Sequence, residues 1–340
     1  MNRKSEKKLL LIARNSATIL FILFIIMLIC ILVKLNSNFD NDGRIIKDEK
    51  TFVSALLNNN STKQNQNYYI ANAFDINIES LPQENIIFYG NLDGRGYQIN
   101  IKSKNTEPAY LEHPILYKIE NDANISGLNI KLEKSVILGS VDGKKDCALL
   151  SNYNYGSINN CFVEVERQCI GKNCSNAASL VNYNFSEISN VCLKLKELSA
   201  VDNSIGNWKC RFGALVTINF GVVENILADI HFELDISTRL DVFRNGYNNQ
   251  FVGYLFCELS KNSKVSDIYL FGRTEQGVAF PYWEKACDTG IIGYNKKDYL
   301  EITDSFFLEL RKNADWENYW KLDKTEDFPV LNIGQKHKMR

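Results

Sequence analysis

The most constraining feature of this chain is a passage that it repeats three times. The passage occupies residues 147–161 and returns at 177–191 and 212–226. Aligning the copies superimposes four sets of residues: Leu150, Leu180 and Leu215; Asn154, Asn184 and Asn219; Tyr155, Phe185 and Phe220; and Ile158, Ile188 and Val223. A repeat of this kind is one supersecondary unit, which can bury its apolar face only by stacking on further copies.

The end of the passage recurs beyond the three full copies as apolar residue, any residue, Asn or Asp, then an apolar residue. Its third position holds Asn160, Asn190, Asn225 and Asp267, and Asp304 in a variant that ends in serine. The spacing between copies is irregular, which suits the coils of a solenoid, because their loops can differ in length while the strands stay in register. In a propeller or sandwich the strands would pair within a unit. The repeats therefore predict an all-β fold, a right-handed parallel β-helix over residues 49–335.

Both ends of a solenoid need covering, because an open sheet edge can pair with another chain. Residues 49–57 predict a short amphipathic capping helix with Phe52, Leu56 and Leu57 on one face. Turn-bounded apolar segments at 68–71, 74–78, 86–89 and 97–101 predict the first strands. The aromatic tail at 316–331 is the expected second cap.

The N-terminal residues predict a membrane anchor. Residues 1–34 carry six Lys or Arg and one Glu, a net charge of +5, and residues 17–33 hold no charged side chain. A helix of about 20 apolar residues crosses a bilayer core. We expect a cytoplasmic tail over 1–16, a single transmembrane signal-anchor helix over 17–35 and a linker over 36–48. The alternative is a cleaved signal peptide, but no small-x-small cleavage site follows.

The charge distribution restricts location and partners. Positive charge ahead of the span keeps the N-terminus in the cytoplasm, so we expect the body outside the cytoplasmic membrane, in the periplasm or at the cell surface. The whole chain carries −1, which leaves about −6 for residues 35–340. A mildly acidic body argues against nucleic acid as a partner, because phosphate binding needs a basic face.

The nine cysteines leave their redox state open. Cys161 and Cys192 fall at strand positions, where a buried thiol is the simpler interpretation. Cys169, Cys174 and Cys210 fall between the repeated passages, in expected loops, and are the candidates for a disulfide bond.

Beyond the repeats, residues 49–331 resemble bacterial envelope proteins with a pectin-lyase-like, right-handed parallel β-helix built from GLUG-like repeats. The resemblance rests on Phe52, on 69–77 and 88–99 with their Gly-x-Leu-Asp-Gly-x-Gly-Tyr-x-Ile element, and on the closing Phe-Pro-Val-Leu at 328–331. It implies a surface location, often as an adhesin, and little about any reaction.

Two interpretations compete for the five residues at the third position of the recurring end, which we expect at a corner of each coil. Stacked coils lie about 4.8 Å apart, so Asp267 and Asp304 could form a carboxylate pair for glycoside cleavage. Because Asn160, Asn190 and Asn225 share the position, a structural ladder of hydrogen-bonded side chains is favoured. The three histidines are scattered, so we expect no catalytic residue, no metal site and no cofactor.

The aromatic residues of the repeats, Tyr153, Tyr155, Tyr183, Phe185 and Phe220, also have two interpretations. Core packing is favoured. If alternate rings face outward instead, they form a stripe able to stack on sugar rings.

The sequence thus favours a non-enzymatic, adhesin-like envelope protein that binds a glycan or a surface protein. One alternative is a polysaccharide lyase or glycoside hydrolase. A second is a structural spacer of an envelope assembly. The oligomeric state is left open.

Overall fold

The computed structural model describes residues 44–105, 107–140, 146–170, 175–200, 211–232, 251–253, 255–273, 291–294, 308, 311–312, 316–321 and 330–332. Contacts divide the chain into Met1–Arg44 and Ile45–Arg340, and the second unit is described below. No helix within the described ranges is long and apolar enough to cross a membrane. The predicted tail, anchor helix and most of the linker lie outside those ranges.

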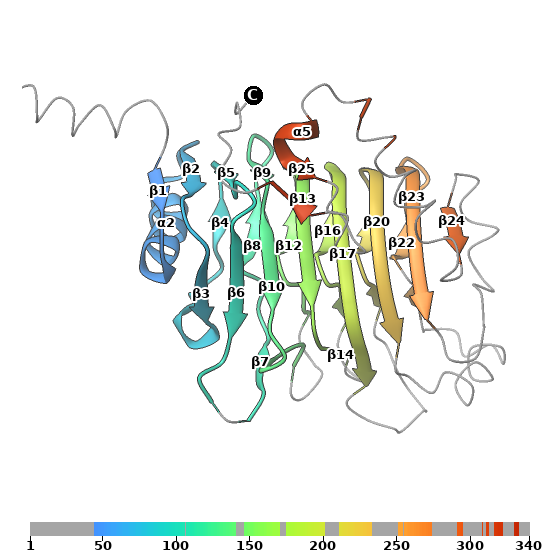
Figure 1. Cartoon of the computed structure of the whole chain (residues 1–340), viewed down its shortest axis with the longest axis horizontal. Helices are drawn as coiled ribbons and strands as arrows, with labels where there is room; N and C mark the ends of the chain where they lie inside the picture. The colour runs from blue at the N-terminus through green and yellow to red at the C-terminus, as the bar shows by residue number, and fades with distance from the viewer. Residues whose placement is uncertain are drawn as a thin grey trace, which may run out of the picture. The chain divides into compact units, whose positions relative to one another are not determined.

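Nearly all of the strands pair in parallel with neighbours one coil away, which confirms the predicted all-β parallel solenoid (Figure 1). The fifteen-stranded sheet contains β1 (Arg44–Ile46), β2 (Asn67–Ile70), β3 (Phe74–Asn77), β5 (Asn91–Asp93), β6 (Gln98–Lys102), β7 (Ala109–Leu111), β9 (Asn124–Ser126), β10 (Asn129–Leu132), β11 (Val136–Leu138), β13 (Ser157–Val165), β14 (Gln168–Ile170), β17 (Glu187–Ala200), β20 (Val222–Phe232), β23 (Lys264–Arg273) and β24 (Ile291–Tyr294).

The remaining strands form three smaller sheets. The six-stranded sheet contains β4 (Ile87–Phe88), β8 (Leu116–Ile119), β12 (Ser151–Asn154), β16 (Val181–Asn184), β19 (Val216–Asn219) and β22 (Phe256–Leu259). A three-stranded sheet contains β15 (Asn176–Ala177), β18 (Arg211–Gly213) and β21 (Phe251–Gly253). The antiparallel pair is β25 (Trp320–Lys321) with β26 (Val330–Leu331). Helical segments are α2 (Glu49–Thr62), the 3-10 turn η1 (Ile78–Ser80) and α5 (Trp316–Tyr319).

The three repeated passages stack in the register that their alignment predicts. In the six-stranded sheet Asn184 pairs with Asn154 on one side and Asn219 on the other. In the large sheet Ile188 pairs with Ile158 and Val223 in the same way. Each passage therefore supplies one strand to the six-stranded sheet and one to the fifteen-stranded sheet, and the copies lie one above the other along the solenoid.

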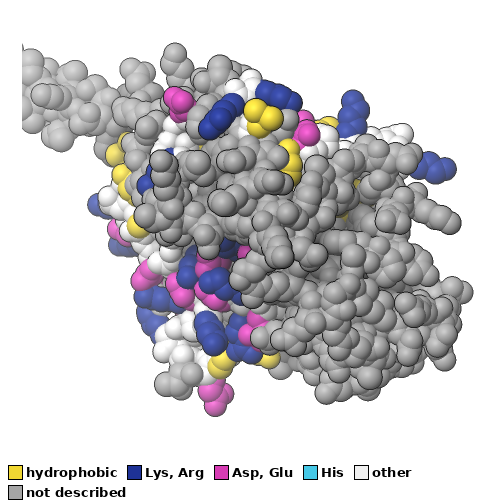
Figure 2. Space-filling view, turned by 45° about the vertical axis from the view of Figure 1, so that its right-hand side comes forward, with side chains coloured by type: hydrophobic (Ala, Val, Ile, Leu, Met, Phe, Trp, Pro, Cys, Tyr) yellow, Lys and Arg dark blue, Asp and Glu magenta, His cyan; other side chains and the backbone are white. Residues whose placement is uncertain are grey.

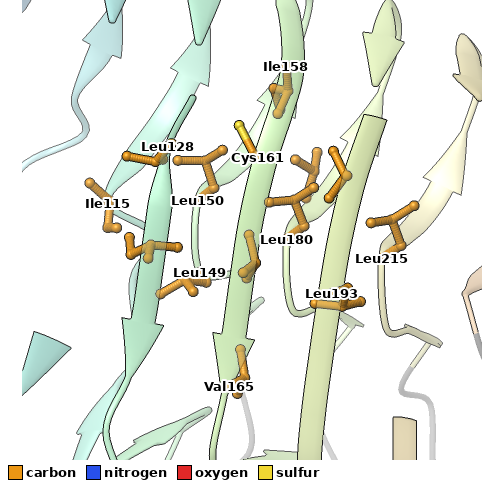
Figure 3. Close-up of a cluster of buried hydrophobic side chains, with 14 of the residues drawn as sticks. Ile115, Leu128, Leu149, Leu150, Ile158, Cys161, Val165, Leu180, Leu193 and Leu215 are labelled. Atoms are coloured by element: carbon orange, nitrogen blue, oxygen red, sulfur yellow. The ribbon is translucent and has the colours of Figure 1, made fainter. Parts of the chain in front are cut away.

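The interior is filled by the apolar residues of the repeats. Leu150, Leu180 and Leu215 are at most 2% exposed and follow one another from coil to coil (Figure 3). Ile158, Ile188 and Val223 are fully buried in the same core. Each coil adds its side chains to one continuous apolar column, and this burial is the main stabilising contribution.

Helix α2 covers the N-terminal end of this column, as expected for a capping helix. Its N-terminus is a capping box, in which the Asp48 carboxylate accepts from the Thr51 backbone N–H at 2.8 Å and the Thr51 hydroxyl accepts from the Asp48 backbone N–H at 3.1 Å. Phe52 and Leu56 are buried, whereas Leu57, which we expected on the same face, is 38% exposed.

Helix α2 extends through the asparagines at 58–60 to Thr62. Two of these asparagines accept hydrogen bonds from backbone N–H groups of the first strands. The backbone N–H of Tyr89 donates to Asn59 Oδ1 at 2.7 Å, and that of Ile87 donates to Asn60 Oδ1 at 3.0 Å. Glu49 Oε1 accepts from the Asn77 backbone N–H at 2.7 Å. Side chains of α2 thus bond backbone N–H groups in and just after β4 and at the end of β3, two strands that are each paired with one other strand, which protects the sheet edge.

The aromatic C-terminal tail does not have the position that we expected for a second cap. The described part, α5 with β25 and β26, packs on β13 in the middle of the solenoid (Figure 1). Trp320 is 1% exposed, and its Nε1 donates to Asn160 Oδ1 at 3.1 Å. A Cβ at Gly96 would lie 2.1 Å from the Asn332 backbone oxygen, so the close approach requires glycine there.

Candidate ligand-binding face

The most distinctive surface feature is a stack of rings outside the six-stranded sheet, which we name the aromatic column: Tyr155, Phe185 and Phe220. Tyr155 and Phe185 have ring centroids 4.6 Å apart and are tilted by 3°; Phe185 and Phe220 are 4.8 Å apart and tilted by 1°. Phe185 is 38% exposed and Phe220 is 41% exposed. The prediction that these phenylalanines fill the core is therefore wrong.

A second set of rings, the tyrosine column, lies on β8, β12 and β16; its members Tyr153 and Tyr183 come two residues before Tyr155 and Phe185. Tyr117 meets Tyr153 edge to face at 5.4 Å, and Tyr153 stacks on Tyr183 at 5.2 Å. All three are half-buried. The Tyr183 hydroxyl accepts from Asn176 Nδ2 at 2.8 Å, and Asp146 in turn accepts from both nitrogens of Asn176. These contacts fix the position of the Tyr183 hydroxyl.

Burial, followed by the neighbouring Tyr117, raises the pKa of the Tyr153 phenol. The Tyr153 phenol therefore stays uncharged over the neutral range, so this ring combines an apolar face with a neutral hydroxyl group.

The rings face outward because asparagines occupy the alternate, inward positions. Asn154, Asn184 and Asn219 are fully buried. Asn154 Nδ2 donates to Asn184 Oδ1 at 2.8 Å, and Asn184 Nδ2 donates to Asn219 Oδ1 at 2.8 Å. Side chains alternate along a strand, so inward Asn154 places Tyr153 and Tyr155 outside. The alternation was visible in the sequence, but only the inter-coil hydrogen bonds make buried asparagine favourable.

The corner residues Asn160, Asn190, Asn225 and Asp267 share one backbone conformation. Their φ angles lie between 51° and 54°, in the left-handed region, where Asn and Asp are tolerated better than most residues. Each lies within a long strand and bends it. Asn225 Nδ2 donates to Asn190 Oδ1 at 2.7 Å, while Asn160 bonds Trp320. Asp304, the fifth predicted member and the proposed carboxylate partner of Asp267, lies outside the described residues.

The acidic side chains near this corner affect one another. Burial, followed by the charges of Glu187 and Asp267, raises the pKa of Glu224. The described ranges contain no group of three or more His, Cys, Asp or Glu residues arranged to hold a metal ion. The shared left-handed φ makes the corner a bend in each strand, and the neighbouring carboxylates repel one another there.

The outer face of the large sheet carries an internally paired charge cluster. Lys131 and Lys196 each contact both Glu164 and Glu166, at distances between 2.8 and 3.2 Å. Burial would raise the pKa of Glu164, but hydrogen bonds from the two lysines outweigh it and hold the pKa below its ordinary value. Figure 2 shows basic and acidic side chains interleaved on the described surface. Such mutual pairing suits a solvated face better than a ligand site.

The cysteines that the structure describes lie in strands or against the core. Cys161 and Cys192 are fully buried free thiols. Cys169 is 7% exposed and lies in β14 rather than in a loop, next to Gly139, which has a φ of 152°. Cys174 and Cys210, its predicted partners, lie outside the described ranges, so a bond among the three stays a prediction.

Comparison with known proteins gives no relative for this chain. No family model, no curated protein and no solved structure matches it.

Proposed function

We propose that this chain is a membrane-anchored, extracytoplasmic solenoid that binds a glycan or a surface protein through the aromatic and tyrosine columns, without catalysing a reaction. The observation that carries the proposal is the exposure of Phe185 and Phe220 in a stacked row. Apolar rings that could have been buried are instead held at the surface by a buried asparagine ladder. Contiguous apolar surface of this kind is typical of interaction sites.

The anchor supports the proposed location. An uncharged apolar segment preceded by basic residues favours a topology in which the acidic solenoid lies outside the cytoplasmic membrane. We further propose that the coils are right-handed, as in pectin-lyase-like proteins with GLUG-like repeats, because crossovers between parallel strands are right-handed in nearly all cases.

Binding is tested with a glycan array probed by the full-length chain in detergent. Saturable binding that falls when Tyr155, Phe185 and Phe220 are all replaced by serine supports the proposal. A reducing-end assay on each bound glycan then separates binding from cleavage, since release of new reducing ends would favour a hydrolase or lyase.

Location is tested with protease added to intact cells and to spheroplasts. The solenoid should be degraded while the first sixteen residues stay protected. Protection of the solenoid with loss of the N-terminus would contradict the proposed topology.

A further inference from the structure

The aromatic column has two ends, and they differ. Its members occupy one repeat position, because the backbone N–H groups of Tyr155, Phe185 and Phe220 donate to the preceding coil at 2.9, 2.8 and 2.7 Å. Ser260 continues this series: its N–H donates to the Asn219 backbone oxygen at 2.9 Å. A serine therefore lies one strand spacing, about 4.8 Å, beyond Phe220 where the stack would otherwise place a fourth ring.

The serine leaves one ring face uncovered. The Phe185 ring has a neighbouring ring on each side, and the outer face of Tyr155 is covered by the Lys118 ammonium, 4.8 Å from the centroid. Lys118 is held there by Glu120 at 2.6 Å. Within the described ranges, Phe220 contacts only one ring, that of Phe185. A hydroxymethyl side chain is too short to cover a phenyl ring, so no ring of the described residues covers the other face of Phe220, which is 41% exposed.

A polar turn follows Ser260. Ser260 begins a turn that ends at Ser263, whose N–H and hydroxyl both donate to the Ser260 backbone oxygen, at 3.0 and 2.7 Å. Lys261 and Asn262 of this turn are exposed. It is longer than the two-residue corner Phe220–Gly221 of the preceding coil. The coil next to Phe220 thus contributes Ser260 and, within the following two residues, an exposed ammonium and an exposed amide.

We propose that the open face of Phe220 is a stacking subsite for one pyranose ring of a β-linked glycan, an inference that rests on the proposed binding function. Equatorial hydroxyls leave a pyranose with an apolar C–H face, which packs on the phenyl ring. An equatorial β-glycosidic bond continues the chain roughly in the plane of the ring and keeps that face flat, whereas the axial bond of an α-linked chain projects from one face. The same hydroxyls point outward around the rim, where Ser260, Lys261 and Asn262 supply hydrogen-bond donors.

The subsite is tested by titrating the full-length chain in detergent with cellohexaose, chitohexaose and laminarihexaose, with α-linked maltohexaose for comparison. Phe220→Ala should weaken binding of the β-linked probe about tenfold, the size of a lost stacking contact. Ser260→Phe should weaken it at least as much, because the added ring covers the open face. Ser260→Ala leaves the face open and should stay within about threefold of the wild type, the size of one modest hydrogen bond.

The two substitutions guard against unfolding, because Ser260→Phe removes no native ring contact. If the wild type binds a β-linked probe and both Phe220→Ala and Ser260→Phe bind it with the same affinity as the wild type, the subsite is overturned and the binding function still stands. Preference for maltohexaose would overturn the assigned linkage. Binding of no glycan, on the array or in the titration, would overturn the subsite and the glycan-binding function together.

Discussion

Asn184 accepts a hydrogen bond from Asn154 on one coil while its own amide donates to the next coil, and both contacts measure 2.8 Å. The amides thus form a directed chain inside the protein. Its first member, Asn154, has an unpartnered Oδ1, since the preceding coil presents Ile119 at that position. The chain explains how polar residues tolerate full burial in a solenoid core.

Replacing Asn184 with alanine should cost about 2–5 kcal/mol of unfolding free energy, because two buried amide groups lose their partner. Urea unfolding of the full-length chain in detergent measures this loss. Asn121→Ala, at an exposed turn residue, should stay within about 0.5 kcal/mol. Equal effects of the two substitutions would show that the ladder contributes nothing.

Gly96→Ala should displace the C-terminal hairpin from the solenoid. The new Cβ would lie 2.1 Å from the Asn332 oxygen, and the φ of 69° disfavours alanine. We expect faster trypsin cleavage after the exposed Lys321, read by mass spectrometry, with an unchanged rate at exposed Lys261. An unaltered Lys321 rate would argue against the packing of the hairpin on the middle coils.

Glu224→Gln should raise the melting temperature at pH 7 but not at pH 4. Burial and the neighbouring Glu187 and Asp267 raise the pKa of Glu224 in the folded state. A carboxyl group with a raised folded pKa contributes stability below its unfolded pKa and loses it as the pH rises through the folded value. Neutral glutamine avoids that loss. Glu107→Gln, at an exposed position, serves as the control and should leave the melting temperature unchanged at both pH values. Equal shifts of the melting temperature of Glu224→Gln at pH 7 and pH 4 would refute the repulsion.

The thiol of Cys161 should resist alkylation by iodoacetamide at pH 8 until the protein unfolds. Burial raises its pKa to about 12, and only the thiolate reacts. Cys192, whose burial raises its pKa well above the ordinary value, should behave alike. Peptide mapping after native and denatured labelling measures both sites. Rapid native labelling of either cysteine would contradict its place in the core.

The repeated passages were sufficient to predict the parallel solenoid and its register. Residues equivalent to Leu150 and Ile158 recur because every coil must add apolar side chains to the same core. Each coil meets this requirement within its own short stretch of sequence. Cap α2 was predictable for the same reason, although its end was not. Its last turn is fixed by Asn59 and Asn60, which bond strands about thirty residues away in the chain.

The candidate site was harder to predict, because hydrophobicity alone gives the wrong answer to which side chains of the strand are buried and which are exposed. Aromatic residues usually lie inside and asparagines outside, yet Asn184 is buried and Phe185 is exposed. The inter-coil hydrogen bonds reverse the preference. The contact of Trp320 with Asn160 joins residues far apart in the sequence, and no local pattern indicates it.

That the aromatic column serves a ligand rather than the fold is tested most directly by hydroxyl-radical footprinting of the full-length chain, with and without a glycan that it binds. We predict that Phe185 and Phe220 are oxidised readily in the free protein while the fully buried Phe212 is not, and that the glycan protects Phe220. The proposal would be contradicted if Phe185 and Phe220 were oxidised as slowly as Phe212, or if the bound glycan left the oxidation of Phe220 unchanged.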